Sequence, residues 1–488
     1  MKRLAHATQR AGTFLFDGRT VPFHLGDTPA AALHAQAIRT LARSRKFHRP
    51  RGLSGSFVAG HLCGVDGSPH VRLDRLAAAQ GMRVTTENVW PCGAFDLLGS
   101  ARLLPRRWLR AGFEHSPLMP SGTARFEPWE RFMRFMAGEA PVHAGNRRAI
   151  PQGRRMTSDV VVVGGGPAGR EAANAAAAQG RSVALVTRGH VAGAKAAAWG
   201  AVLPALHDGV TVLTAHDACG LYDRGRHLLC APHDAASSAT IVAAGEVILA
   251  TGRRSAPPLV AGADLPGVMD AETALTLAHR HAVAPGERVA VVGNGMEDTL
   301  AARLERLGVT VVACQPVERL ERIVGWSAVS GIDAGGHIAC DCVVHAGPWR
   351  SDRRLAFMAG ADGDLRVLGG PLPAMVRLAG AAQEADEPVG HGAALDRRAL
   401  ACPCMDVTVD ELLDLIAAGE THVEVLKRLT GCGMGPCQGI PCWDNLAHIV
   451  AHATGREPSG IGHPTYRPPG AGLTLAQAAG LQDLVPLS

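Results

Sequence analysis

The sequence predicts an α/β protein in which Rossmann-type units lie between an N-terminal region that opens on a β-hairpin and a small helical C-terminal domain. Short apolar strands alternate with alanine-rich helices from Asp159 onward. Two apolar runs flank an Asp17-Gly18 turn near the start of the chain. Five of the twelve cysteines fall between Cys402 and Cys442. This dense cluster indicates a metal site rather than a disulfide scaffold.

Composition bounds the class of protein. The 488 residues, 47% hydrophobic and 19% charged, suggest a globular chain of about three domains. Only 4% are aromatic, and the net charge is +5, so neither a nucleic acid nor an anionic membrane is expected as a partner. No apolar run reaches the roughly 18–20 residues of a membrane span. No apolar segment follows the basic Met1–Arg10, so we expect no secretory signal and a cytoplasmic location.

The N-terminal region reads as a hairpin followed by a helix. Strands are expected at Thr13–Phe16 and Thr20–Phe23. A helix follows, with Asp27 or Thr28 as N-cap, and ends near Ala37. A basic stretch covers residues 44–52, and residues 144–158 read as a polar linker.

A first βαβ unit carries a nucleotide-binding pattern. The strand Val160–Val163 runs into Gly164-x-Gly166-x-x-Gly169 and then a helix, and a second strand follows at Val183–Val186. Such glycines let a pyrophosphate reach the N-terminus of a helix. A later buried strand ends in Thr251-Gly252. We expect a cofactor site made of Gly164, Gly166, Gly169, Thr251 and Gly252.

One part of this pattern departs from a dinucleotide site. The acid expected at the end of the second strand is replaced by Thr187-Arg188. A ribose diol therefore lacks its carboxylate partner, and Arg188 can instead meet a phosphate. We expect one adenine nucleotide here, which is FAD, NAD or ATP. The alternative is a Rossmann domain kept only as a scaffold.

A second Rossmann-like module is inserted in the first. The strand Val289–Val292 enters Gly293-Asn294-Gly295, but Asp298 replaces the third glycine. The next strand ends at Cys314-Gln315 without an acid, so an NAD(P)H site is not expected in this module. The predicted domains are residues 1–143, 157–284 with a return at 343–398, the inserted module 285–342, and the C-terminal domain and tail 399–488.

The C-terminal cysteines form two pairs. Cys402 and Cys404 are spaced C-x-C, and Cys432 and Cys437 are spaced C-x4-C. Zinc sites usually use C-x2-C, whereas four thiolates in this pattern suit a [2Fe-2S] cluster. The glycines of Cys432–Cys437 let backbone N–H groups approach sulfur. We expect Cys437 to begin a helix and Cys442 to be a neighbour rather than a ligand. A structural zinc site and ordinary buried thiols are the alternatives.

At these residues the chain resembles a known family. The segment 47–52 (FHRPRG), the segment 87–91 (ENVWP) with Asp96, and 128–130 (PWE) resemble the amino-terminal part of the alpha subunit of heterotetrameric sarcosine oxidase. The Rossmann region is similar to that family and to subunits of opine oxidase, hydroxyproline dehydrogenase and hydrogen cyanide synthase. The C-terminal cysteines resemble the bacterioferritin-associated ferredoxin-like [2Fe-2S] domain.

The sequence departs from this family in three places. Some relatives have an N-terminal β-grasp ferredoxin domain with a second cluster, but the loop after the first helix here contains only Cys63, so we expect a β-grasp-like domain without a cluster. Residues 379–381 (AGA) lack the acid of FAD-binding relatives and are closer to the sarcosine oxidase pattern, for which the family implies NAD. The sequence stops at Ser488, before the folate-binding half found in that family, so folate chemistry is not expected.

The resemblance implies an electron-relay subunit that holds a nucleotide and a [2Fe-2S] cluster. We find no nucleophile-and-base set, and so name no catalytic residue. Oxidation of a CH–NH donor such as sarcosine, proline, hydroxyproline or an opine would require a partner flavoprotein resembling D-amino-acid oxidase, with further small subunits and an FMN at the partner interface. The basic residues 45–51 would lie near that interface or a flavin phosphate. The alternatives are a self-sufficient NAD(P)H-dependent FAD/[2Fe-2S] reductase and a non-catalytic zinc-containing assembly scaffold.

Overall fold

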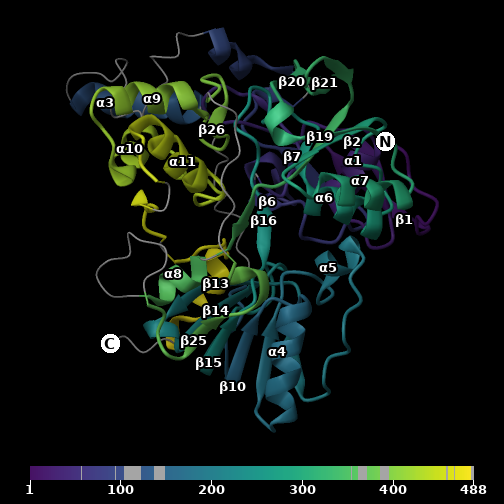
Figure 1. Cartoon of the computed structure of the whole chain (residues 1–488), viewed down its shortest axis with the longest axis vertical. Helices are drawn as coiled ribbons and strands as arrows, with labels where there is room; N and C mark the ends of the chain where they lie inside the picture. The colour runs from purple at the N-terminus through teal and green to yellow at the C-terminus, as the bar shows by residue number, and fades with distance from the viewer. Residues whose placement is uncertain are drawn as a thin grey trace. The chain divides into compact units, whose positions relative to one another are not determined.

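The computed structural model describes residues 1–56, 58–93, 95–103, 123–136, 149–352, 354–360, 371–384, 395–457, 460–466 and 468–484. The chain folds into two compact units (Figure 1). The first contains Met1–Asn146, Ser255–Pro348 and Pro388–Pro464. The second contains Arg147–Arg254, Trp349–Glu387 and Thr465–Ser488. Each unit is therefore built from three separate stretches of chain.

A β-grasp sheet opens the first unit. Its strand order is β2-β1-β7-β5-β6, with β1 parallel to β7 and antiparallel to β2. The β1–β2 turn has positive φ at Asp17 (47°) and Gly18 (80°), the backbone that a two-residue hairpin turn needs. The elements of this region are β1 Arg10–Phe16, β2 Arg19–His24, α1 Pro29–Ala35, β3 Ala42–Arg43, β4 Pro50–Arg51, η1 Val58–His61, β5 Leu62–Val65, β6 Ser68–Arg72, β7 Arg83–Thr86, β8 Pro91–Cys92, β9 Phe95–Asp96, η2 Leu97–Leu103 and α3 Thr123–Met136.

Helix α1 covers this sheet with an almost wholly buried surface. Thr28 is its N-cap, since the Thr28 hydroxyl accepts a hydrogen bond from Ala31 N at 3.2 Å. Leu33 of α1 and Phe14 and Val21 of the sheet are at most 1% exposed. The predicted hairpin and helix are thus confirmed, and Thr28 is the cap of the two that the sequence offered.

The second Rossmann-like module also belongs to the first unit. Its parallel sheet has the order β17-β23-β18-β19, and it carries a three-stranded antiparallel sheet, β20-β21-β22. Because β17 and β23 join the same sheet, this module extends beyond residues 285–342 on both sides. Its elements are β17 Val268–Asp270, α6 Ala271–Leu275, the π-helical turn Thr276–Arg280, β18 Val289–Gly293, α7 Glu297–Arg306, β19 Val311–Pro316, η6 Val317–Arg319, β20 Arg322–Gly325, β21 Val329–Asp333, β22 His337–Ala339 and β23 Cys342–Ala346.

Three helices and a short hairpin complete the first unit. They share a core that includes Leu412, Leu426 and Leu446, all fully buried, together with the cysteines. The Thr408 hydroxyl caps the first of these helices by accepting from Glu411 N at 3.2 Å. The elements are β26 Leu400–Cys402, β27 Val407–Thr408, α9 Val409–Ala417, α10 Val423–Thr430 and α11 Cys442–Thr454.

The second unit is built on a seven-stranded sheet. The order is β12-β11-β10-β15-β14-β13, and β25 pairs with β15. The strands β12, β11, β10, β15 and β25 are parallel, while β13 and β14 form an antiparallel extension. The strands are β10 Arg154–Val163, β11 Val183–Val186, β12 Val210–Leu213, β13 His216–Tyr222, β14 His227–Pro232, β15 Thr240–Leu249 and β25 Val376–Leu378.

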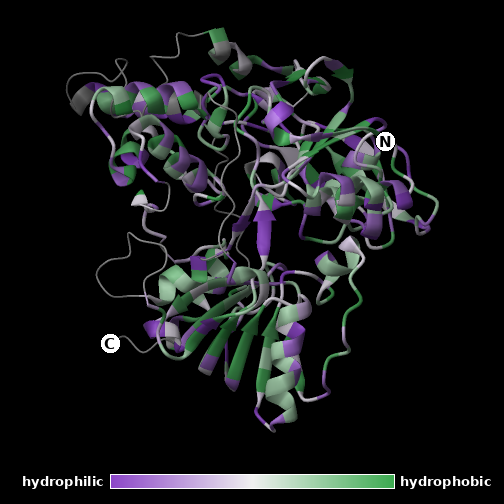
Figure 2. Ribbon diagram, viewed as in Figure 1, coloured by the Kyte–Doolittle hydropathy of each residue, from purple (hydrophilic) through white to green (hydrophobic). Residues whose placement is uncertain are grey.

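Strand β10 begins earlier than its sequence indicates. The polar composition predicts a linker over residues 154–158, but these residues pair with residues 240–244 of β15. Figure 2 shows β10 changing from hydrophilic at its start to hydrophobic at its end. The hydrogen bonds of the sheet therefore override the polar composition of this segment. The rest of the predicted linkers at 144–158 and 383–398 lies partly outside the described residues.

The C-terminal tail belongs to the second unit, not to the cysteine domain. The Gln477 side chain is 2% exposed, and its amide donates to the carbonyl oxygens of Pro232, Asp234 and Ser237 at 3.1–3.2 Å. The remaining elements of this unit are α4 Pro167–Ala178, α5 Ala194–Trp199, η4 Asp223–Gly225, β16 Arg253–Ser255, β24 Trp349–Ser351, α8 Arg354–Ala359, η7 Gly380–Ala382, α12 Leu475–Ala479 and η9 Gln482–Leu484. Among the described residues, no helix combines the length and apolar character needed to cross a bilayer.

Candidate functional site

The four predicted thiolate ligands converge in the helical domain of the first unit. Cys402 ends β26, Cys404 follows in the next turn, and Cys432 and Cys437 lie in the loop between α10 and α11. All four are 0–4% exposed. Cys442 is also fully buried, and its Sγ lies 3.9 Å from Cys437 Sγ. The structure therefore brings five cysteines together, one more than the predicted set.

The five thiols form a chain of neighbours in the order Cys432, Cys402, Cys442, Cys437, Cys404. Hydrogen bonds from Cys432 and Cys442 lower the pKa of Cys402 well below its ordinary value. Those from Cys404 and Cys442 lower the pKa of Cys437 to about 5. Buried sulfurs that ionise readily are the soft donors that iron and zinc take.

The arrangement of the sulfurs bears on which metal group they fit. Among the described residues, no three or more histidine, cysteine or acidic side chains surround one point as a single ion requires. A [2Fe-2S] cluster instead takes four cysteines shared between two irons. Two pairs of thiols, Cys402 with Cys432 and Cys404 with Cys437, match that demand.

The backbone approaches the sulfurs closely, as the glycines predicted. Gly433 N donates to Cys402 Sγ at 3.3 Å. A Cβ at Gly435 would lie 2.5 Å from Cys404 Cβ, so any larger residue there would displace the cysteine. N–H groups directed at sulfur stabilise cluster-bound thiolates.

The expectation that Cys437 begins a helix is wrong. Cys437 lies in a turn, and α11 begins at Cys442. Positive φ at Gln438 (52°) and Gly439 (84°) prevents helical continuation from Cys437. Cys442, rather than Cys437, therefore lies in the first turn of a helix, but its hydrogen bonds with Cys402 and Cys437 and its burial raise its pKa well above the ordinary value.

A buried ion-pair network ties the basic loop to the cysteine loop. The Arg51 guanidinium donates to Asp406 Oδ1 at 2.8 Å, to Asp264 Oδ2 at 2.6 Å and to the Pro403 carbonyl at 3.2 Å. Asp406 Oδ2 also accepts from the backbone N–H of Phe47 at 3.1 Å. Burial alone would lower the pKa of Arg51, but the two carboxylates raise it above its ordinary value. The basic residues 45–51 are therefore not simply a solvated face.

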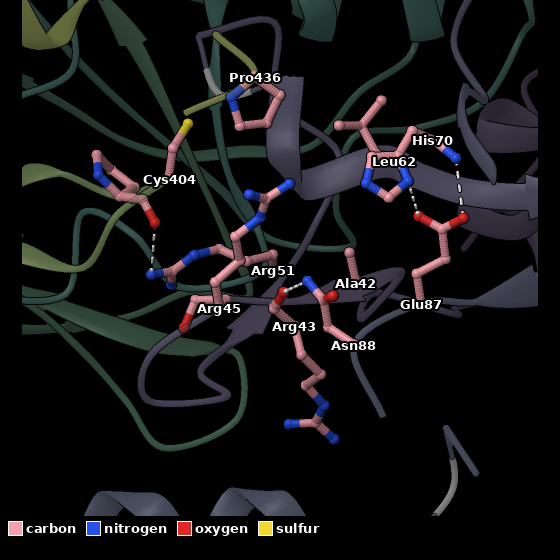
Figure 3. A pocket seen from close by; sticks show the side chains of 12 residues that line it. Ala42, Arg43, Arg45, Arg51, Leu62, His70, Glu87, Asn88, Cys404 and Pro436 are labelled. Atoms are coloured by element: carbon pink, nitrogen blue, oxygen red, sulfur yellow. Dashed lines mark hydrogen bonds and ion pairs between the residues drawn. The ribbon is translucent and has the colours of Figure 1, made fainter. Parts of the chain in front are cut away.

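A pocket opens beside this network (Figure 3). Its empty volume, including the part open to solvent, is ≈ 420 Å³. Arg51 reaches the Pro403 carbonyl on one side of it, and His70 pairs with Glu87 on the other (2.9 Å). The lining residues are Ala42, Arg43, Ser44, Arg45, Arg51, Leu62, His70, Glu87, Asn88, Pro403, Cys404 and Pro436. One wall thus includes a predicted cluster ligand.

One cation in this pocket lacks a counter-charge. Within the described residues, the guanidinium group of Arg45 has no hydrogen-bond or ion-pair partner. The Arg43 side chain runs away from the pocket in Figure 3, and the charge of Arg51 is balanced by Asp406 and Asp264. A concave site with an unpaired guanidinium group is suited to a phosphate or another anion.

The predicted nucleotide residues come together at the carboxyl edge of the sheet in the second unit. Gly164 has φ +112° and lies against the Ala250 carbonyl, which a Cβ would approach to 2.1 Å. A Cβ at Gly169 would lie 1.8 Å from the Gly164 carbonyl, so this helix–turn packing requires glycine. At Gly166 a Cβ would meet nothing within 4 Å. The turn therefore leaves open space at the N-terminus of α4, as a pyrophosphate needs.

The other predicted cofactor residues lie at the same edge. Thr251 donates to the Asp352 carbonyl at 2.8 Å, and Gly252 has φ +72°. Arg188 follows β11, the strand beside β10, and its side chain is exposed. The structure thus gathers Gly164, Gly166, Gly169, Arg188, Thr251 and Gly252 around one edge.

Part of the matching edge of the second Rossmann-like module is covered by the chain itself. Gly55 N donates to Asp270 Oδ2 at 2.6 Å and to Thr273 Oγ1 at 2.9 Å. Asp270 is 2% exposed and ends β17. Beside it, the buried Ser255 hydroxyl contacts His345 Nδ1 at 2.6 Å. No local pattern of residues indicates this packing. It covers the end of β17, whereas a Cβ at Gly295, after β18, would meet nothing within 4 Å.

Three parts of the chain match known protein families. Residues 158–330 match pyridine nucleotide-disulphide oxidoreductases, residues 397–481 match the sarcosine oxidase A3 domain, and residues 9–89 match a 2Fe-2S iron-sulfur cluster binding domain. The last match agrees with the β-grasp sheet, although Cys63 is the single cysteine in that range. That this domain holds no cluster stays a prediction.

Curated relatives extend the resemblance along the chain. The alpha subunit of sarcosine oxidase from Rhizobium meliloti (strain 1021) is 29% identical over 93% of this chain and 56% of its own length. The opine oxidase A subunit of the same strain is 34% identical over 17% of this chain and 18% of its own length. The chain thus spans about half the length of the sarcosine oxidase relative, and its match to the opine oxidase relative covers a smaller part.

A solved structure supports the fold over nearly the whole chain. L-proline dehydrogenase from P. horikoshii superposes with a TM-score of 0.73 at 21% identity, and covers 98% of this chain and 99% of its own. The expected α/β fold and the resemblance to sarcosine oxidase alpha subunits are confirmed. The expected classes of cofactor are also confirmed, since the matched domains are of iron–sulfur and pyridine-nucleotide types. The chain is thus similar to oxidoreductase subunits.

Proposed function

We propose that this chain is the electron-relay and nucleotide-binding subunit of a multi-subunit, flavin-dependent oxidase or dehydrogenase of amines or amino acids. Its donors would be CH–NH compounds such as sarcosine, proline, hydroxyproline or opines. Activity would depend on a flavoprotein partner resembling D-amino-acid oxidase, in an assembly that can include further small subunits. The similarity to the alpha chain of a sarcosine oxidase supports this class of reaction.

The observation that carries the proposal is the pocket between the basic loop and the cysteine loop. Its wall contains Cys404, and its cations include Arg45, which has no partner in the described part of the chain. An anionic redox cofactor bound here would lie against a thiolate ligand. We propose that this cofactor is FMN, with its phosphate on Arg45.

The proposed cluster ligands are Cys402, Cys404, Cys432 and Cys437, with Cys442 as the fifth thiol beside them. When bound, the flavin supplies two-electron oxidation and the [2Fe-2S] cluster supplies one-electron transfer. The chain's own residues fix the geometry between the two sites. Arg51 holds the Pro403 carbonyl, between Cys402 and Cys404, and so keeps the cysteine loop against the pocket.

In the second unit, the glycine turn Gly164–Gly169 is proposed to hold one adenine nucleotide at the N-terminus of α4. Gly166 leaves room for the pyrophosphate, and Thr251 and Gly252 border the same edge. The nucleotide would be bound without turning over. In the second module Asp298 replaces the third glycine, which gives no support to a self-sufficient NAD(P)H reductase.

The experiment is co-expression with the oxidase-like subunit, followed by dye-linked assays on sarcosine, proline, hydroxyproline and opines. The complex should reduce dye with at least one of these amines, while the isolated chain should not. Equal rates from the isolated chain would refute the relay role. Metal analysis separates the alternative of a zinc scaffold, since that protein would contain zinc and neither iron nor sulfide.

A further inference from the structure

Arg188 lies at the place where a dinucleotide site holds the adenosine ribose. Thr187 N donates to Leu213 O at 2.9 Å and the Thr187 side chain is 9% exposed, so Arg188 is the first exposed side chain beyond β11. In Rossmann sites an acid here accepts from the ribose 2′-hydroxyl, whereas an arginine accommodates a 2′-phosphate. A guanidinium has no acceptor atom, so Arg188 cannot replace that carboxylate.

The backbone on both sides of Arg188 is fixed. The Thr187 carbonyl accepts from His216 N at 3.1 Å, and the Gly189 carbonyl accepts from Ala215 N at 3.0 Å. These bonds hold the segment against the start of β13. The position of Arg188 at the carboxyl edge is therefore set by the fold rather than by a free loop.

The neighbouring carboxylate, that of Asp352, is already paired with guanidinium groups of the protein. Asp352 Oδ1 and Oδ2 accept from Arg354 at 2.9 and 2.8 Å, and Arg254 Nη1 lies 3.9 Å from Oδ2. Burial alone would raise the pKa of the Asp352 carboxyl. Arg354, Arg254 and Arg188 together hold that pKa below its ordinary value. The Asp352 carboxylate is thus held by protein cations and does not stand in for the acid missing at the end of β11.

We propose that Arg188 selects an adenine nucleotide that carries a phosphate on its ribose 2′-oxygen, so that the ligand is of the NADP(H) class. This inference rests on the proposed nucleotide site at Gly164–Gly169. A 2′-phosphate offers oxygen atoms that accept bidentate hydrogen bonds from the guanidinium. A ribose diol, by contrast, would find no carboxylate at the end of β11.

The test is isothermal titration of the nucleotide-free chain with NADP⁺, NAD⁺, adenosine 2′,5′-bisphosphate, ADP and ATP. Any nucleotide that co-purifies is first released and identified by chromatography. NADP⁺ should bind roughly 10- to 100-fold more tightly than NAD⁺, and adenosine 2′,5′-bisphosphate should show the same advantage over ADP. Arg188→Leu should remove this advantage and leave NAD⁺ binding nearly unchanged.

A matched control lies at the opposite end of the same strand. Arg181 precedes β11 and pairs with Glu246 at 2.7 Å, away from the glycine turn. Arg181→Leu should therefore keep the preference for NADP⁺. Equal affinity for NADP⁺ and NAD⁺, or a preference that survives Arg188→Leu, would overturn the inference and leave the nucleotide site standing. Tight binding of ATP, without binding of adenosine 2′,5′-bisphosphate, would also overturn the inference and leave the nucleotide site standing. Failure of every nucleotide to bind would instead refute the nucleotide site itself.

Discussion

The Arg51 guanidinium donates to Asp406 Oδ1 at 2.8 Å, and these side chains are 3% and 0% exposed. Asp406 lies two residues after Cys404, and Arg51 lies in the basic loop more than 350 residues earlier. The pair therefore joins the β-grasp region to the cysteine loop within the first unit. Because both groups are buried, each is required to neutralise the other.

Replacing Arg51 by methionine should destabilise the first unit strongly. The change removes the nearest cation of the buried Asp406 and of Asp264, which costs about 3–5 kcal/mol of unfolding free energy. Chemical denaturation of the variant measures this loss. Arg49→Met is the matched control, since Arg49 is 28% exposed and its Nε lies 3.6 Å from Asp406. The control should cost at most about 1 kcal/mol. Equal effects of the two changes would contradict the special role of Arg51.

The cysteines should hold about two irons per chain in protein prepared without oxygen. Cys402→Ser and Cys437→Ser should abolish the iron and acid-labile sulfide, because each of these sulfurs has a thiol neighbour on both sides. Cys92→Ser, at an exposed cysteine, is the control and should keep both. Stoichiometric zinc without sulfide would show that the site is structural.

Cys442 provides a sharper test of the proposed ligand set. With Cys402, Cys404, Cys432 and Cys437 as ligands, Cys442→Ser should retain the cluster, and Cys432→Ser should lose it. If Cys442→Ser lost the cluster and Cys432→Ser retained it, Cys442 would be the fourth ligand in place of Cys432. Such an exchange is sterically open, because Cys442 Sγ lies 3.9 Å from Cys437 Sγ. Iron and sulfide analysis of the two variants decides between the sets.

Gly166→Val should block the nucleotide without harming the fold. A side chain at this position meets nothing within 4 Å, and the backbone φ of −71° suits any residue. The added atoms would instead occupy the space that the pyrophosphate needs. The nucleotide released on denaturation measures the loss. Gly472→Val, at another open glycine of the same unit, should retain the nucleotide. If Gly166→Val retained its full content of nucleotide, the nucleotide would have to bind somewhere other than this turn.

The stability of the first unit should fall as the pH drops from about 6.5 to about 4. Burial lowers the pKa of His34 to about 4, and its hydrogen bond to the Pro285 carbonyl offsets this only in part. In that window the unfolded chain takes up a proton that the folded chain does not. The cost at His34 reaches about 3 kcal/mol below pH 4.

Denaturation at several pH values tests this dependence. His34→Gln keeps an N–H donor but cannot be protonated, so it should flatten the slope between pH 6.5 and 4. A slope that is identical in His34→Gln and the unaltered chain would exclude His34 as its source.

Local signals in the sequence were sufficient for much of the fold. The Asp17-Gly18 turn, the Thr28 cap and the strand Val160–Val163 each depend on residues that are neighbours in the chain. The glycine turn after β10 and the convergence of the cysteine pairs were also predictable. The physical reason is that these features follow from backbone conformation and from donor chemistry at fixed spacing.

Local signals in the sequence could not predict the contacts between distant segments. The partnership of Arg51 with Asp406 and the bond from Gly55 to Asp270 join residues more than 200 positions apart. Polar residues 154–158 become strand because residues of β15 pair with them. The central place of Cys442 depends on a helix start that Gly439 delays. Each of these features is decided by tertiary packing, which spacing alone does not encode.

The last prediction concerns Arg45 in the pocket beside Cys404. If Arg45 binds the phosphate of FMN, Arg45→Met should weaken FMN binding by the complex roughly 10- to 100-fold, because a charge-assisted hydrogen bond is lost. Iron and sulfide should stay unchanged, since within the described residues Arg45 has no bond to the cysteine loop. Dye reduction should fall with FMN content and recover on adding FMN. Arg19→Met, at an exposed arginine of β2, should alter neither. If Arg45→Met kept its full FMN content, the flavin would not bind in this pocket. If the variant lost iron together with FMN, Arg45 would instead support the fold of the cysteine loop.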